Sequence, residues 1–428
     1  MYNMECREEA WDMNQVPRQQ IAGSSVGVIG GSIAGCAAAI ALERLDCEVT
    51  ILERSSTGLQ DRGSGIAMPP PLRDEMVEHG YLPADYPSWA AVGRRWYVAD
   101  GSPGGALCWI QPGDARTNNW GTLWRGLRSK VPDSVRYEDG AEAVRIAESI
   151  DGVAVYLADS SERRFDVVVG ADGYRSQVRS HLHPDSRPRY AGYVLWRGNF
   201  PAARLSDRDA WDEVLETQVW ITVAFDGGHG VMYPIPDFDA VTSGAWRVNW
   251  AIYAPTPEGL ELDGPSSIPP GGLGDDVYAQ FQTLLDERFP ERFRPLFDSP
   301  QSEVSLQPIY DELVDSYTSG RVMLIGDAAT LSRPHTGSGA TKAMQDARLL
   351  ETLGAEHTTW DTLLTAYDAD RSATGRTLVE LGRRIGRDQV EQTPPWAEMS
   401  AAEYEAWAAG TLDGDTLYFW GDDTDQDL

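Results

Sequence analysis

Three apolar runs that end in glycine or aspartate constrain the fold of this chain more than any other feature. Residues 26–29 are followed by Gly-Gly-Ser, residues 167–169 by Gly-Ala-Asp-Gly and residues 322–325 by Gly-Asp. Buried parallel strands read as continuous apolar runs, and open α/β sheets bind ligands at the carboxyl ends of their strands. The runs therefore predict one parallel sheet with a single large nucleotide lying across its edge.

The composition bounds the class of protein. A chain of 428 residues with 42% hydrophobic residues can form one large or two ordinary domains with a sizeable core. No apolar run approaches the roughly 20 residues of a membrane helix, and the polar N-terminus lacks a signal-peptide pattern. The net charge of −30 argues against nucleic acids and anionic membranes as partners. Four cysteines without metal-ligand spacing predict a reduced, cytoplasmic protein without a metal site.

The pattern of elements predicts two kinds of sheet. A strand at 26–29, an Ala-rich helix at 33–46 and a strand at 48–53 form one βαβ unit. Strands at 153–157 and 165–169 are expected to extend its sheet. From residue 190 onward the chain is rich in Trp, Tyr and Val, and four runs predict a largely antiparallel sheet, at 194–200, 219–225, 231–235 and 245–253.

The apolar strand pattern of the first unit resumes near residue 321, so the antiparallel sheet is expected to form an inserted domain. A Gly/Pro-rich loop is predicted at 61–71, a hairpin near 92–110 that joins the inserted sheet, and a long loop at 255–274. The expected segments are a disordered tail at 1–21, a nucleotide-binding domain at 22–188 and 302–357, a substrate domain at 189–301, C-terminal helices at 358–410 and an acidic tail at 411–428.

The glycine-rich turn after the first strand predicts a pyrophosphate site. Glycines there allow a tight turn and a close approach of the backbone, and the helix N-terminus supplies unpaired N–H groups. Glu53 ends the second strand, where a carboxylate can bind ribose hydroxyls, and Arg54 follows it. The alternative is a glycine-rich turn without a ligand. The candidate residues of this turn are Gly30, Gly31, Ser32, Ala34 and Gly35.

Two aspartates at the other strand ends are further candidates for binding the nucleotide. Asp172 and Asp327 can each accept a hydrogen bond from a ribose or ribitol hydroxyl, and Asp172 can also cap the helix that follows it. A second glycine-rich helix start offers N–H groups and the positive end of a helix dipole, suited to negative charge on a bound group. Its residues are Gly337, Ser338, Gly339, Ala340 and Thr341.

The motifs resemble those of a known protein family. They occur in the same order, and an aromatic-rich sheet is inserted between them. Over residues 22–385 the chain resembles the FAD-dependent aromatic hydroxylases, the single-component flavoprotein monooxygenases of the para-hydroxybenzoate hydroxylase type. The stretch Ala-Asp-Gly at 171–173 is similar to the family's Asp-Gly motif, and Gly-Asp at 326–327 is similar to its Gly-Asp motif. Segments at 190–198, 233–236 and 333–335 resemble the branch of 2,6-dihydroxypyridine 3-hydroxylase.

The resemblance implies a fold and a set of cofactor contacts. The fold is α/β, with a Rossmann-like FAD-binding domain, an inserted and mainly antiparallel β-sheet substrate domain, and C-terminal helices. FAD is the expected cofactor, held without a covalent bond, and NADH or NADPH the expected electron donor. The residues that this adds to the FAD site are Arg62, Trp120, Gly173, Gly326 and Pro334.

The resemblance also implies an activity. NAD(P)H would reduce FAD, O2 would add to give a C4a-hydroperoxide, and one oxygen atom would pass to an electron-rich aromatic or heteroaromatic small molecule. One alternative is a tailoring enzyme of secondary metabolism, either a polyketide or alkaloid oxygenase or a redox-neutral cyclase that retains FAD. A second is a redox-silent, FAD-carrying binding protein. The expected partners are the small molecule and O2, with the chain as a monomer or homodimer.

The inserted sheet is expected to cover the flavin, because the reaction must exclude water. The substrate would then lie between the flavin and this sheet, against Arg197, Tyr233, Trp246 or Trp250. Residues 66–70 are expected near the flavin edge. Pro334, His335 and Arg197 are the candidate catalytic residues.

Two further polar residues have competing interpretations. His229 follows Gly-Gly and is predicted to lie in a surface turn, because His commonly occupies exposed or intermediate positions. Asp311 either faces the active site or is a loop carboxylate.

Overall fold

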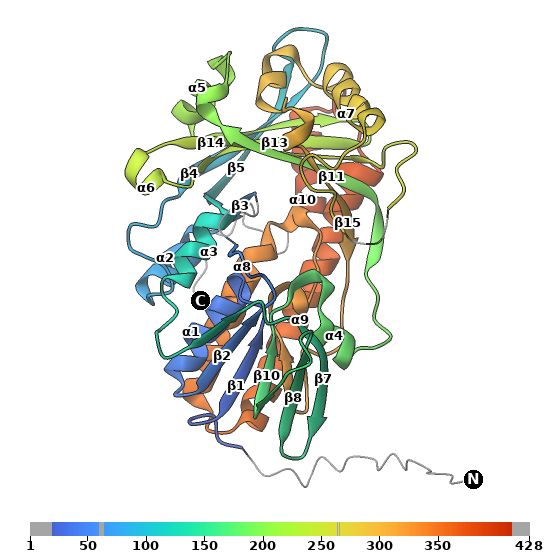
Figure 1. Cartoon of the computed structure of the whole chain (residues 1–428). Helices are drawn as coiled ribbons and strands as arrows, with labels where there is room; N and C mark the ends of the chain where they lie inside the picture. The colour runs from blue at the N-terminus through green and yellow to red at the C-terminus, as the bar shows by residue number, and fades with distance from the viewer. Residues whose placement is uncertain (1–18, 60–63, 263, 265, 413–428) are drawn as a thin grey trace, which may run out of the picture.

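The computed structural model describes residues 19–59, 64–262, 264 and 266–412. Two sheets lie one above the other, with helices on their outer faces and between them (Figure 1). Most of the predicted tails at 1–21 and 411–428, and Arg62 of the predicted FAD site, lie outside the described residues.

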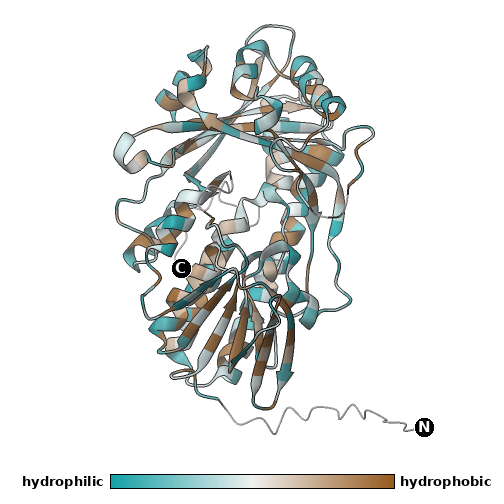
Figure 2. Ribbon diagram, in the orientation of Figure 1, coloured by the Kyte–Doolittle hydropathy of each residue, from teal (hydrophilic) through white to brown (hydrophobic). Residues whose placement is uncertain are grey.

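The lower sheet has six strands in the order β16-β17-β10-β1-β2-β6. All neighbouring pairs are parallel except β16 with β17. The apolar strands stand out in brown in the lower half of Figure 2. The strand bounds are β1 Ser25–Ile29, β2 Glu48–Glu53, β6 Arg136–Asp139, β10 Val167–Gly170, β16 Thr318–Ser319 and β17 Val322–Leu324.

The helix α1 (Ile33–Arg44) packs against this sheet and against α8 (Ser338–Glu356). Its first ten residues are buried, because alanines and one glycine let the helix approach its neighbours closely. The helix α9 (Trp360–Gly386) follows α8 and packs on it. The βαβ unit and the long C-terminal helix are therefore where the sequence pattern predicts them.

A separate three-stranded sheet corrects one sequence prediction. Residues 153–157 were expected in the parallel sheet, but they lie in β8 (Gly152–Leu157), which pairs with β7 (Ala143–Ser149) and β9 (Glu162–Phe165). The predicted strand at 165–169 is divided at Asp166. Its carboxylate accepts hydrogen bonds from the amide and hydroxyl of Ser25, at the junction of β9 and β10.

The upper sheet has eight strands in the order β15-β11-β14-β13-β12-β4-β5-β3. Only β12 and β4 pair in parallel; the others pair antiparallel. Residues 65–68 were predicted as part of a loop but form the edge strand β3, because Gly65–Met68 pair with the end of β5. The bounds are β3 Gly65–Met68, β4 Trp89–Val98, β5 Ala106–Asn119, β11 Arg189–Pro201, β12 Val219–Phe225, β13 Gly228–Pro236, β14 Trp246–Pro255 and β15 Ser305–Asp311.

The outer face of the upper sheet is covered by α5 (Asp209–Thr217), α7 (Asp275–Arg288) and the 3-10 segment Glu291–Leu296, seen at the top of Figure 1. Buried aromatic rings fill this layer, for example Trp250 stacked on Phe281 with centroids 5.4 Å apart. The remaining helices are α2 Pro70–Glu78, α3 Trp120–Arg128, α4 Gln177–Leu182, α6 Ala240–Ser243 and α10 Ala401–Thr411.

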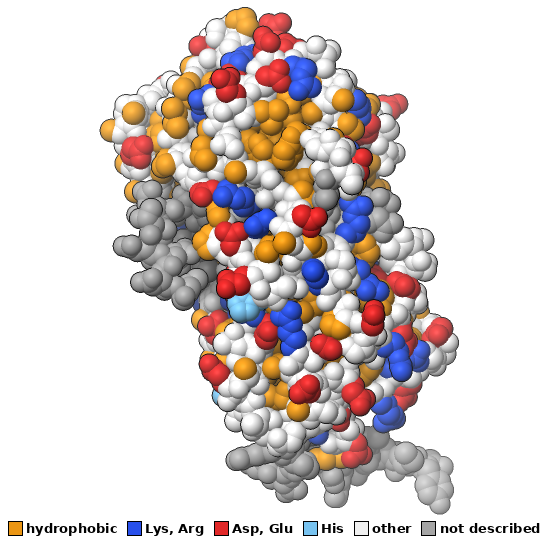
Figure 3. Space-filling model, turned by 90° about the vertical axis from the view of Figure 1, so that its left-hand side faces the viewer, with side chains coloured by type: hydrophobic (Ala, Val, Ile, Leu, Met, Phe, Trp, Pro, Cys, Tyr) orange, Lys and Arg blue, Asp and Glu red, His pale blue; other side chains and the backbone are white. Residues whose placement is uncertain are grey.

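The surface of the described residues carries both charge signs. Acidic and basic side chains are interspersed over the face drawn in Figure 3. Among the described helices, none combines the length and the apolar character that spanning a membrane would require.

Candidate functional site

Two adjoining cavities run from the carboxyl edge of the parallel sheet to the underside of the upper sheet. The first, of about 570 Å³, lies at the strand ends and is called the strand-end cavity here. The second, of about 340 Å³, lies under the upper sheet and is called the sheet-side cavity. They share five lining residues: Ser32, Trp120, Ala171, Gly173 and Asp327. An elongated ligand can therefore extend from one cavity into the other.

The glycine-rich turn after β1 is shaped by close backbone contacts. Gly30 has φ of +101°, and a Cβ there would lie 2.4 Å from the carbonyl oxygen of Ala171. A Cβ at Gly35 would lie 1.8 Å from the carbonyl oxygen of Gly30. These glycines let the turn double back tightly into α1. Gly30 and Ser32 line the strand-end cavity, and Ala34 lines the sheet-side cavity.

Glu53 ties this turn to the end of β2. Its carboxylate accepts hydrogen bonds from the amides of Gly31 (2.8 Å) and Ser55 (2.7 Å). Glu53 and Arg54 both line the strand-end cavity. Glu53 thus shapes the turn and is placed to meet a ligand hydroxyl with its remaining lone pairs.

Asp172 caps the start of helix α4, which is the second role that the sequence indicated for it. Its carboxylate accepts hydrogen bonds from the amides of Gln177 (2.7 Å) and Val178 (3.3 Å) and from the Ser176 hydroxyl. Burial raises the pKa of the Asp172 carboxyl, and these hydrogen bonds oppose that rise. Asp172 and Gly173 also line the strand-end cavity, so both roles are compatible.

The Gly-Asp end of β17 faces the glycine-rich start of α8. Asp327 lines both cavities and pairs with Lys342. Gly337, Gly339 and Ala340 line the sheet-side cavity. Five predicted cofactor residues do not line either cavity: Gly31, Gly35, Gly326, Ser338 and Thr341.

The sheet-side cavity has an aromatic roof that contains a guanidinium group. Arg197 and Tyr233 line it, as predicted, and the Tyr233 ring stacks on Trp220 with centroids 4.3 Å apart. One Arg197 nitrogen donates to the carbonyl oxygen of Gly65 (3.3 Å), while its Nε is buried without a partner among the described residues. Pro334 and His335 form part of the same wall.

The prediction that Trp246 and Trp250 contact the substrate was wrong, because they do not line the cavity. Arg197 pairs with Ala251 across the sheet, and Trp250 pairs with Gly198 one residue further on. Successive residues of a strand face opposite sides, so Trp250 points outward, where its Nε1 donates to Ser299. Trp246 lies four residues before Trp250, on the same outer face.

The prediction that His229 lies in a surface turn was also wrong, because the residue is buried on β13. Its side chain is 1% exposed, and its ring stacks on Tyr253 with centroids 4.7 Å apart. Burial, together with the smaller effect of the Arg94 charge, lowers the pKa of His229 to about 3. The Gly-Gly turn ends just before His229, so the strand begins earlier than the sequence pattern indicated.

Several lining residues of the sheet-side cavity were not predicted. Arg94 is buried on β4, where its Nε donates to the Thr222 hydroxyl and its guanidinium lies 4.3 Å from the Trp96 ring centroid. Alternation along β4 could have indicated its face, but not that β4 pairs with β12. The other lining residues that were missed include Tyr253, Gln307, Leu331 and Gln389. Ile66 also lines this cavity, and it belongs to the 66–70 segment expected near the flavin.

Asp311 lies at the end of β15, fully buried between two arginines. It accepts from Arg333 Nε (2.9 Å) and from Arg383 Nε (2.9 Å). Asp311 lines neither cavity, so it supports the wall that carries Pro334 and His335.

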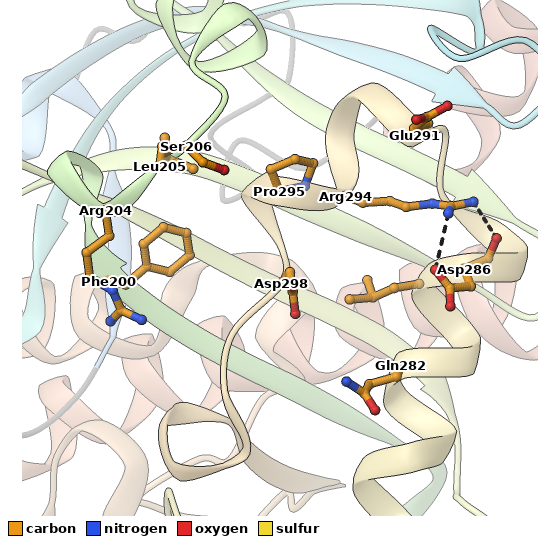
Figure 4. Close-up of a pocket in the computed structure, with 11 residues that line it drawn as sticks. Phe200, Arg204, Leu205, Ser206, Gln282, Asp286, Glu291, Arg294, Pro295 and Asp298 are labelled. Carbon is orange, nitrogen blue, oxygen red and sulfur yellow. Dashed lines mark hydrogen bonds and ion pairs between the residues drawn. The ribbon is translucent and has the colours of Figure 1, made fainter.

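A third hollow, of about 490 Å³, lies on the outer face of the upper sheet (Figure 4). Phe200 and Arg204 line one side, and Arg294 lies opposite, paired with Asp286. None of the predicted site residues that the structure describes lines it. It is therefore separate from the two adjoining cavities.

The strand-end residues fit a dinucleotide that reaches the sheet-side cavity. Backbone at Gly173 and Gly339 borders the cavities, and a Cβ at either would meet nothing within 4 Å. A glycine-rich turn, a carboxylate after β2 and a helix start at the far end supply donors and acceptors for phosphates, ribose and ring. This fold and this site define a flavoprotein oxidoreductase with FAD as its cofactor.

Comparisons with known proteins give the family. Models described as "FAD binding domain" and "FAD binding domain-like" match residues 280–381 and 190–311, and one described as "Pyridine nucleotide-disulphide oxidoreductase" matches 25–81. The 2,6-dihydroxypyridine 3-monooxygenase of Paenarthrobacter nicotinovorans is 30% identical over 76% of this chain and 81% of its own length. The chain belongs to the FAD-dependent aromatic monooxygenases.

Other relatives agree with this assignment. Salicylate hydroxylase of Pseudomonas putida is 27% identical over 81% of each chain. The structure of 2,6-dihydroxypyridine-3-hydroxylase from Arthrobacter nicotinovorans superposes with a TM-score of 0.76 at 27% identity, covering 87% of this chain and 94% of that one. The predicted fold class and cofactor are therefore confirmed.

Proposed function

We propose that this monooxygenase hydroxylates an electron-rich aromatic or heteroaromatic ring held in the sheet-side cavity, with NAD(P)H as reductant and O2 as oxidant. The observation that carries this is the position of that cavity. It adjoins the strand-end cavity, shares five lining residues with it, and is roofed by Tyr233, Trp220 and Arg197. FAD that lies in the strand-end cavity and extends its ring system to the start of α8 in the sheet-side cavity would supply the redox chemistry there.

The lining residues bind, orient and shield the ring. Tyr233, Trp220 and Tyr253 offer flat apolar faces for stacking. Arg197 offers its unpartnered Nε to a ring oxygen or a carboxylate on the substrate. The upper sheet keeps bulk water away from the reacting face.

The size of the sheet-side cavity favours a small ring over a large polyketide or alkaloid. Its volume of about 340 Å³ is near the lower end of the usual ligand-pocket range, roughly 300–1,000 Å³, and the flavin ring beside Gly337 and Gly339 would take part of it. Among the described residues of the long loop at 255–274, none lines this cavity.

The test is turnover with ring compounds on which relatives act, 2,6-dihydroxypyridine and salicylate being the first probes. We expect purified protein to be yellow, to oxidise NAD(P)H faster with the right compound, and to place one atom of labelled O2 in the product. Anaerobic turnover without NAD(P)H would instead establish the redox-neutral cyclase. FAD binding without any turnover would leave the redox-silent binding protein.

A further inference from the structure

The hydroxyl of Tyr193 lies between a guanidinium group and an imidazole. Tyr193 is on β11, 1% exposed, with its oxygen 2.8 Å from His335 Nε2 and 3.3 Å from an Arg333 terminal nitrogen. A guanidinium only donates, so the Tyr193 oxygen accepts from Arg333. The Tyr193 O–H therefore donates its hydrogen to His335 Nε2, which acts as the acceptor. If Nε2 carried its own hydrogen, the tyrosine O–H would have no acceptor among the described residues.

Arg333 is held firmly enough to impose this direction. Its Nε donates to Asp311 (2.9 Å), and the nitrogen that contacts Tyr193 also donates to Glu391 (2.7 Å). At Gly386, helix α9 packs directly against the Tyr193 hydroxyl and the Arg333 guanidinium. A Cβ there would lie 2.3 Å from the Tyr193 oxygen and 2.7 Å from the Arg333 nitrogen.

The surroundings of His335 keep its ring neutral. Burial and the nearby His229, Arg333 and Arg94 hold the pKa of His335 well below its ordinary value. The ring stacks on Tyr253 with centroids 4.0 Å apart. None of the described carboxylates lies within hydrogen-bond distance of the imidazole to oppose this effect.

With Nε2 as acceptor, the hydrogen of the neutral ring is on Nδ1. This nitrogen is buried and has no partner among the described residues, although His335 lines the sheet-side cavity. A buried donor without an acceptor is unfavourable, and a ligand that supplies an acceptor relieves that cost.

We propose that Tyr193 is a positioning residue that fixes His335 as the Nδ1–H tautomer, which donates a hydrogen bond to an oxygen of the ligand in the sheet-side cavity. His335 is then a fixed donor and does not exchange protons with the substrate near neutral pH. The proposal rests on the proposed function only in placing a ligand in that cavity.

The tautomer can be measured directly by ¹⁵N NMR on FAD-loaded protein with labelled histidine. The chain has six histidines, and the signal missing from His335→Asn assigns His335. We expect a protonated Nδ1 and an unprotonated Nε2, unchanged from about pH 5.5 to 8, the range in which ordinary histidines titrate. A hydrogen on Nε2, or a titration midpoint within this range, would overturn the proposal.

Two variants and one control test the role of Tyr193. Tyr193→Phe removes the hydroxyl that donates to His335, and Gly386→Ala displaces that hydroxyl. In each variant the ¹⁵N signals of His335 should show a larger fraction of the tautomer with its hydrogen on Nε2. Tyr190→Phe removes another hydroxyl of β11, one that contacts Thr256, and should leave the signal unchanged. If Tyr193→Phe and Tyr190→Phe give the same spectrum as the parent, Tyr193 does not set the tautomer.

The donor role has its own readout, independent of turnover. The Nδ1-bound proton should move downfield when FAD is added to FAD-free protein, or when 2,6-dihydroxypyridine or salicylate is added to FAD-loaded protein. A resonance that none of the three moves would overturn the donor role. Failure of the proposed function would appear separately, as absence of NAD(P)H oxidation.

Discussion

Lys342 Nζ lies 2.5 Å from Asp327 Oδ1, and this ion pair joins the end of β17 to helix α8. The two partners differ in burial: the Lys342 side chain is 4% exposed and that of Asp327 is 41% exposed. Removing the aspartate therefore leaves a buried ammonium group without its partner, which is costly. Asp327 thus has a structural role besides the proposed contact with FAD.

The first prediction separates these two roles. Asp327→Ala should weaken FAD binding by about 1–3 kcal/mol, the scale of a lost hydrogen bond to a buried polar partner, and should also lower the free energy of unfolding. Asp327→Ala combined with Lys342→Met should recover stability but not FAD affinity. Fluorescence titration of FAD and urea unfolding measure the two quantities. Equal FAD affinity in all three proteins would refute the contact.

The second prediction concerns Glu53. Glu53→Gln keeps the side-chain shape but removes one of the two acceptors that hold the Gly31 and Ser55 amides. FAD affinity should fall by about 1–3 kcal/mol. Glu48→Gln, at the exposed start of the same strand, is the matched control and should bind FAD like the parent. If the two variants bind FAD equally well, Glu53 does not contribute.

The third prediction concerns Arg197. Arg197→Lys loses the Nε donor and should raise KM for the ring substrate about tenfold or more, the scale of a charged hydrogen bond, while FAD content stays the same. Arg95→Lys is the control, because Arg95 lies on β4 and pairs with Glu213 away from both cavities. Unchanged steady-state kinetics in Arg197→Lys would remove Arg197 from the substrate site.

The fourth prediction concerns the buried Asp311. Asp311→Asn leaves Arg333 without its full counter-charge, and Arg333 is only 5% exposed. The free energy of unfolding should fall by about 3–5 kcal/mol, as expected when one partner of a buried ion pair is removed. Glu303→Gln, which breaks the exposed pair with Arg204, should cost less than about 1 kcal/mol. Comparable losses in the two variants would contradict the structural role given to Asp311.

The fifth prediction follows from the lowered pKa of His229. Folded His229 has a pKa of about 3, against 6.5 for an unperturbed histidine. Between these values the unfolded chain binds a proton that the folded chain does not, so stability falls as pH falls below 6.5. The slope should be up to about 1.4 kcal/mol per pH unit for this group. Urea unfolding at several pH values should show a smaller slope in His229→Gln than in the parent.

The parallel sheet could be predicted because its signals are local. The glycine turn, the Ala-rich helix and Glu53 lie close together in the sequence, and βαβ units of this length form one kind of structure. The inserted sheet was predicted from the runs rich in Trp, Tyr and Val after residue 190, and the resemblance then implied FAD as the cofactor. By contrast, the edge strand β3 consists of four residues in a Gly/Pro-rich stretch, and only its pairing with the distant end of β5 makes it a strand.

The residues of the upper sheet that line the sheet-side cavity, called the substrate wall here, were harder to predict. Strand register decides which of these residues face the cavity. Trp250 and Ala251 are neighbours in sequence, yet only Ala251 faces the cavity. A shift of one residue in register reverses every face. Arg94 enters the wall through the parallel pairing of β4 with β12, between strands more than a hundred residues apart, and nothing in the local pattern of β4 indicates that neighbour.

The order of strands along the chain has an evolutionary consequence. Among the described strands, β1 and β2 belong to the lower sheet, β3–β5 to the upper, β6 and β10 to the lower, β11–β15 to the upper, and β16 and β17 to the lower. The chain therefore passes between the sheets four times, and no single cut frees the substrate wall from the cofactor site. Replacement of individual side chains on the inner face of the upper sheet changes the substrate wall and leaves the flavin machinery in place.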